Sequence, residues 1–92
     1  MKLVRDKIPL IAPHRRYRRA SPGELPRLLA EKVVEEALEL RDNPSLEEMA
    51  DVYEALRALA EALGYGWADV EEAAEEKKRR RGGFREGWVL VD

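Results

Sequence analysis

Apolar residues recur every three or four positions over long stretches of the chain, which is the spacing of one face of an α-helix. The clearest stretch follows Ser45-Leu46-Glu47-Glu48, a capping-box pattern that predicts a helix start. We expect its large apolar side chains to form a buried seam: Met49, Val52, Leu56, Leu59 and Leu63. A parallel stripe of mostly small residues predicts the close approach of another helix: Asp51, Ala55, Ala58 and Ala62.

Capping and turn residues mark two more helices. Ser21-Pro22-Gly23-Glu24 predicts a helix over about 22–41, which Asp42-Asn43-Pro44 ends. Gly64 and Gly66 end the second helix, and a third is predicted over about 67–80, before Gly82-Gly83.

The two ends of the chain lack a helical pattern. Met1–Pro9 is predicted to be irregular, because Pro9 and Pro13 prevent a continuous helix. Gly87–Val91 is aromatic and β-branched, so it is a candidate strand that could pair with Arg15–Arg19.

The predicted fold is therefore all-α: an antiparallel helical bundle of three main helices with short extended terminal segments. A chain of 92 residues makes one domain, 1–92. Chains of this size bury only about 60–65% of their unfolded surface, so we expect oligomerisation to complete the core.

Composition narrows the possible chemistry. The chain has no Cys, one His and a net charge of −2, from 17 Lys+Arg and 19 Asp+Glu. The absence of Cys excludes disulfides, thiolate zinc sites and a Cys nucleophile. No apolar run reaches the roughly 18–20 residues of a membrane span, and no signal peptide pattern is present, so we expect a cytoplasmic protein.

Two acidic pairs carry the candidate chemistry: Glu36/Glu39 on the first predicted helix and Glu48/Asp51 on the second. The i, i+3 spacing places each pair on one helix face. If the short turn makes a hairpin, positions equally distant from it lie level, so 39 meets 48 and 36 meets 51. Carboxylates gathered this way select hard cations such as Mg²⁺ or Mn²⁺. Glu35, beside Glu36, can join them.

Simpler readings of the acidic pairs remain open. Acids at i, i+3 are common on solvated helix faces, and Glu48 could serve only as the capping-box partner of Ser45.

Cations gather at the two ends of the chain, with seven in Lys2–Arg19 and five in Lys77–Arg81. Such segments can neutralise the phosphates of a substrate. They can also contact RNA, with Tyr17 available to stack on a base, although a solvated or substrate-facing segment is favoured.

Four segments together resemble the small MazG-like, all-α nucleotide pyrophosphohydrolases, often described as phosphoribosyl-ATP pyrophosphohydrolase-like. The segments lie in the same order and span nearly the whole chain: Lys2-Leu3-Val4-Arg5-Asp6-Lys7-Ile8-Pro9, Lys32-Val33-Val34-Glu35-Glu36-Ala37-Leu38-Glu39-Leu40, Glu47-Glu48-Met49-Ala50-Asp51-Val52 and Lys77-Lys78-Arg79-Arg80-Arg81-Gly82-Gly83-Phe84.

The resemblance implies a four-helix-type core completed by a homodimer or homotetramer, and Mg²⁺-dependent cleavage of a nucleoside triphosphate to the monophosphate and pyrophosphate. It implies four metal ligands: Glu36, Glu39, Glu48 and Asp51. Lys32 and Glu35 would lie beside the site, and Glu35 is the candidate general base. The candidate phosphate contacts are Lys32, Lys77, Arg80 and Arg81.

Two other classes of function compete with this hypothesis. One is a helical interaction module whose acids only decorate a dimer surface. The other is an RNA-binding module that uses Arg15–Arg19 and Lys77–Arg81, which is the less favoured partner class.

Overall fold

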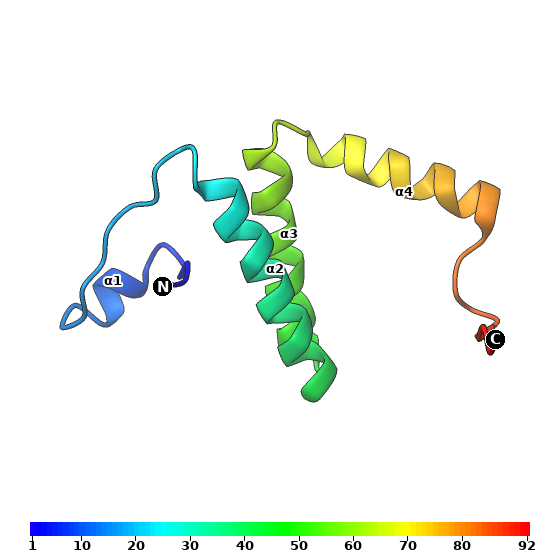
Figure 1. The fold of residues 1–92 in the computed structure, drawn as a ribbon, viewed down its shortest axis with the longest axis horizontal. Coiled ribbons are helices and arrows are strands. Elements are labelled where there is room, and N and C mark those ends of the chain that lie inside the picture. The colour runs from blue at the N-terminus through cyan, green and yellow to red at the C-terminus, as the bar shows by residue number, and fades with distance from the viewer.

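A computed structural model describes residues 1–92 as four helices without a strand. The helices are α1 (Ile8–Ile11), α2 (Leu25–Asp42), α3 (Leu46–Ala62) and α4 (Trp67–Arg81). Figure 1 shows α2 and α3 side by side as a hairpin, with the N-terminal segment and α1 on one side and α4 leading away on the other. The predicted all-α class is confirmed.

Local hydrogen bonds fix the turn of the hairpin. The N–H of Asn43 donates to the carbonyl of Glu39 at 2.8 Å and closes α2. Pro44 follows, and Ser45 begins α3 by accepting the N–H of Glu48 on its hydroxyl at 3.2 Å. This helix start was predicted, and the short turn sets the register of α2 against α3.

The first long helix begins later than its cap pattern suggests, at Leu25 rather than Pro22. Residues 21–24 form a turn in which the Glu24 carboxylate accepts the N–H of Ser21 at 2.8 Å. Arg18 also donates to that carboxylate, at 2.7 Å. Glu24 thus makes the reciprocal bond of a capping box, but the regular helix starts after it.

The predicted pairing of Gly87–Val91 with Arg15–Arg19 is wrong, since both segments are irregular. Figure 1 shows the two segments on opposite sides of the hairpin, so neither has a strand partner within reach. Trp88 is 89% exposed. At the other end, the irregular stretch holds the single turn of α1, where Pro9 falls in the first turn and is tolerated.

The buried core is small and differs from the predicted seam. Only Leu29, Glu36, Ala55 and Ala60 are buried. Within the predicted seam, Met49 is 56% and Leu56 39% exposed. We attribute this to the rotation of α3, because a helix presents its small side chains where a neighbour approaches most closely. The larger side chains then flank the contact without a second helix to cover them.

The fourth helix does not close a bundle within one chain. It contacts α3 near its start, where Trp67 meets Tyr53 edge-on at 5.5 Å and Arg57 lies over both rings. The radius of gyration is 16.3 Å, whereas a compact domain of this length has about 12 Å. None of the four helices is both long enough and apolar enough to cross a membrane.

Enlarging the buried Ala55 should separate α2 from α3. We expect Ala55→Leu to lower the free energy of unfolding by about 1–3 kcal/mol, because Ala55 is only 7% exposed and a larger side chain overpacks a buried position. Ala50→Leu, at an exposed position of the same helix, should change it by less than about 0.5 kcal/mol. Urea unfolding at one fixed protein concentration measures the free energy of unfolding of both variants. An equal loss in Ala55→Leu and Ala50→Leu would show that α2 does not pack on the stripe of small residues.

Candidate metal centre

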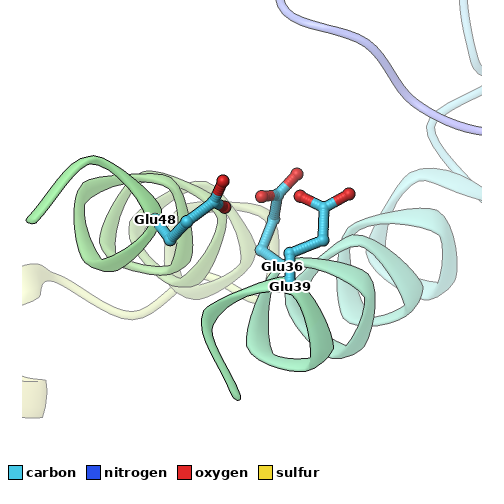
Figure 2. Close-up of side chains that lie close together, drawn as sticks. All are labelled: Glu36, Glu39 and Glu48. Carbon is cyan, nitrogen blue, oxygen red and sulfur yellow. The ribbon is translucent and has the colours of Figure 1, made fainter. Parts of the chain in front are cut away.

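The hairpin brings three carboxylates together near its turn. Glu36 and Glu39 come from α2 and Glu48 from α3, and each offers one oxygen such that all three oxygens lie within 4.8 Å of one another. Figure 2 shows Glu36 and Glu48 directed toward each other across the seam between the helices, with Glu39 beside Glu36. Glu39 and Glu48 are equally distant from the turn, which accounts for their meeting.

Burial separates Glu36 and Glu48 from an ordinary acidic surface, whereas Glu39 is exposed. Glu36 is only 7% exposed. Its Oε1 lies 3.2 Å from the ammonium of Lys32, but its Oε2 is buried without a hydrogen-bond partner. Oε2 of Glu48 is buried and unpartnered as well. A buried carboxylate oxygen without a partner costs free energy that a bound cation would recover.

The carboxylates repel one another. Repulsion from Glu36 is the main cause that raises the pKa of Glu39 above its ordinary value, and partial burial and the charges of Glu48 and Glu35 act in the same direction. A raised carboxyl pKa reports an excess of negative charge at the site.

Asp51 lies apart from the three clustered acids. Its Oδ1 accepts a hydrogen bond from Nη2 of Arg5 at 2.6 Å, and its side chain is 36% exposed. Asp51 and Glu36 both line the same cavity, so the aspartate remains a neighbour of the cluster. Of the four acids that the sequence grouped, the structure gathers three and pairs the fourth with a cation.

Glu35 is held by two ammonium groups. Lys2 contacts Oε1 and Lys32 contacts Oε2, each at 3.2 Å. Burial acts to raise the pKa of Glu35, but the hydrogen bonds from Lys32 and Lys2 outweigh it and the pKa is lowered. Burial likewise acts to lower the pKa of Lys32, and its bonds to Glu35 and Glu36 reverse this. The lowered pKa makes Glu35 a weaker base while both ammonium groups contact it.

The three predicted phosphate contacts on α4 lie elsewhere in the single chain. Lys77, Arg80 and Arg81 occupy the last turns of α4, which leaves the hairpin at the end opposite to the α2–α3 turn (Figure 1). Arg80 lies 3.9 Å from Glu76 on its own helix. One chain therefore does not bring these cations to the acidic cluster.

The structure adds two cations that the site prediction did not single out, Lys2 and Arg5. Both belong to Lys2–Pro9, one of the four segments on which the family resemblance rests, and that membership could have marked them as site residues. Beside them lies a cavity of about 730 Å³ between the N-terminal segment and the hairpin, and its walls include Lys7, Lys32 and Leu29. Small-molecule sites typically have about 300–1,000 Å³.

Comparisons of the chain with protein-family models, with curated proteins and with solved structures found no match. The case for a function therefore depends on the site and on the resemblance of its segments.

Loss of the Ser45 hydroxyl should loosen the start of α3, where Glu48 is held. We expect Ser45→Ala to lower the free energy of unfolding by about 0.5–2 kcal/mol, because the N–H of Glu48 loses its acceptor. Ser45→Thr keeps an acceptor and should retain most of the stability. Chemical denaturation compares the three proteins, and an Ala variant as stable as the wild type would contradict this role of Ser45.

Proposed function

We propose that this protein is a Mg²⁺-dependent nucleotide pyrophosphohydrolase of the MazG-like kind. The observation that carries the proposal is the buried, unpartnered oxygen of Glu36, which lies close to Glu39 on the same helix and to Glu48 across the helix seam. A solvated acidic face would leave that oxygen in water, and a purely structural ion pair would give it a partner.

The donor set fits a hard divalent cation. Glu36, Glu39 and Glu48 supply only carboxylate oxygens, which Mg²⁺ and Mn²⁺ prefer. Asp51 is the fourth candidate ligand, once it is free of Arg5. When bound, the cation would supply charge neutralisation for a phosphate chain and polarisation of the reacting groups.

The cavity beside the cluster suits a nucleotide. Arg5, Lys7 and Lys32 offer positive charge to phosphates, and Leu25 and Leu29 offer an apolar wall to a base or sugar. A divalent cation bound to a phosphate chain needs carboxylates to hold the cation and positive side chains to neutralise the remaining phosphate charge. The adjacent walls of this cavity carry both kinds of group.

The reaction would be hydrolysis of a phosphoanhydride bond. The oxygen of water forms a bond to phosphorus, the P–O–P bridge breaks, and the products are the nucleoside monophosphate and pyrophosphate. The proton of the water passes to a base, for which Glu35 is the candidate because it lies beside Glu36 and outside the three-carboxylate cluster.

We further propose that the active form is a homodimer or homotetramer. The single chain buries only three apolar residues and leaves Met49, Leu56 and Leu63 on α3 substantially exposed. A second hairpin against this face would complete a four-helix core. Oligomerisation is also the route by which α4 of one chain would bring Lys77, Arg80 and Arg81 to the cluster of another.

The same exposed face supports a second candidate, a non-catalytic helical interaction module. Both candidates predict self-association, so association does not separate them. They differ at the cluster, since an interaction module needs no divalent cation.

Divalent cations should bind the wild-type protein and stabilise it. At a concentration of about 100 times Kd, the added free energy of unfolding is about 2.7 kcal/mol. Glu36→Gln and Glu48→Gln should each weaken Mn²⁺ binding at least tenfold, roughly the loss seen when a supporting group of a metal site is removed. Calorimetric titration with Mn²⁺ measures the binding.

Glu47→Gln is the matched control for Glu48→Gln, because Glu47 is its exposed neighbour on α3 outside the cluster. The control should bind Mn²⁺ like the wild type. If Glu47→Gln and Glu48→Gln weaken Mn²⁺ binding equally, the net charge of the protein and not a metal site governs the binding.

Catalysis is tested by release of pyrophosphate from a panel of nucleoside triphosphates with Mg²⁺. We expect Glu36→Gln to lower the rate at least about a hundredfold, the scale of losing one strong electrostatic contact in an active site. Glu47→Gln should retain the wild-type rate. A wild type that binds Mn²⁺ and hydrolyses none of the panel would favour the interaction module.

The oligomer is tested by light scattering on a sizing column. The wild type should elute as a multiple of the 10.6 kDa chain, and Leu56→Glu should shift the mass toward one chain. Ala50→Gln, at an exposed position of the same helix outside the apolar stripe, should leave the mass unchanged. A wild-type protein that elutes as a single chain would refute the proposed assembly.

A further inference from the structure

The N-terminal arm, residues 1–7, is tied to the acidic face of the hairpin by side-chain ion pairs. Lys2 contacts Glu35 at 3.2 Å and Arg5 contacts Asp51 at 2.6 Å. Among the side-chain hydrogen bonds of the chain, these two join the most distant parts of the sequence. The helix that follows the arm, α1, packs on none of the other helices. The position of the arm therefore depends on these ion pairs together with the half-buried Leu3.

Arg5 is the cation of the arm that reaches a candidate metal ligand. It donates through one nitrogen to one oxygen of Asp51, and its other N–H groups make no hydrogen bond within the chain. Its side chain is 57% exposed. The planar guanidinium of Arg5 therefore keeps most of its N–H groups available for a partner with two acceptor oxygens, such as a phosphate.

The arm is also one wall of the cavity beside the cluster. Arg5 and Lys7 line it from the arm, while Glu36 and Asp51 line it from the hairpin. A ligand that enters this cavity meets Arg5 and the acidic cluster together. The buried, unpartnered oxygen of Glu36 independently shows that the cluster lacks positive charge.

From these contacts we propose that Arg5 is an exchangeable counter-ion. It neutralises Asp51 while no divalent cation is present, and it transfers to the phosphates of the nucleotide once a cation takes its place at Asp51. This inference rests on the proposed function and adds a substrate-binding residue and an order of events to it. Arg5 occupies Oδ1 of Asp51, so a cation that takes this oxygen displaces the guanidinium from it. The substrate then offers the displaced guanidinium a stronger acceptor than water.

The proposal makes opposite predictions for the two ligands of the site. Without nucleotide, Arg5→Gln should bind Mn²⁺ about two- to fivefold more tightly than the wild type, the scale of one exposed ion pair that no longer competes. With Mn²⁺ saturating, the same variant should bind pyrophosphate at least about tenfold more weakly, because a charge-assisted hydrogen bond is lost. A purely structural role for Arg5 would weaken both.

Isothermal titration of the 92-residue chain measures both affinities, first with Mn²⁺ alone and then with pyrophosphate. Arg16→Gln is the control for net charge, since Arg16 is exposed and makes no ion pair. It should leave both affinities near the wild-type values. Arg5→Lys keeps the charge and loses the fork, so it should bind Mn²⁺ like the wild type and pyrophosphate more weakly. In an Asp51→Asn background, Arg5→Gln should no longer tighten Mn²⁺ binding.

The outcomes separate this inference from the proposed function. If the wild type binds Mn²⁺ and Arg5→Gln binds it equally or more weakly, Arg5 is not a competitor and the inference is wrong, while the metal site stands. If Arg5→Gln binds pyrophosphate like the wild type, the transfer to phosphate is wrong. A wild type that binds no Mn²⁺ overturns both the proposed function and this inference.

Discussion

Repulsion among the carboxylates of α2 and α3 is the interaction on which the rest of the structure depends. The short turn and the alanine contact hold the two helices close, and this places Glu36, Glu39 and Glu48 within reach of one another. The free energy of that repulsion must be offset by cations. Lys32 supplies one from the same helix, and Lys2 and Arg5 supply two more from the far end of the chain.

This compensation is incomplete, and the shortfall gives the site its chemical character. Buried oxygens of Glu36 and Glu48 have no partner, and Lys32, which contacts the other oxygen of Glu36, is shared with Glu35. Carboxylate oxygens gathered without enough positive charge are the donor set that a hard divalent cation prefers. Under the proposed function, the N-terminal arm, the cavity and the cluster act as one unit, because Arg5 and Lys32 pair with acids of the hairpin and also line the cavity that would hold a phosphate chain.

The parts of this fold that the sequence predicts are those set by local chemistry. The ends of the three long helices and the starts of α3 and α4 follow from capping and turn residues, such as Ser45 and Gly64, which act within a few residues, whereas α2 begins at Leu25, later than its cap pattern predicts. Glu39 and Glu48 lie side by side because the short turn between α2 and α3 places them at equal distances from it.

The buried residues of α3 were predicted wrongly. Periodicity identifies an apolar stripe on the helix, but the rotation of the helix decides which stripe faces α2. The pairing of Arg5 with Asp51 has no signature in sequence spacing, since long flexible side chains meet across 46 positions of the chain. The strand prediction failed for a related reason, because a β-branched segment needs a neighbour that only the tertiary fold can supply.

The most direct measurement is the anomalous scattering of Mn²⁺ in crystals of the 92-residue chain soaked with MnCl₂. The account predicts a peak enclosed by the carboxylates of Glu36, Glu39 and Glu48, with Arg5 withdrawn from Asp51. Well-ordered crystals without a peak there, or with Mn²⁺ bound only to acids elsewhere, such as Glu75 and Glu76 on α4, would contradict it.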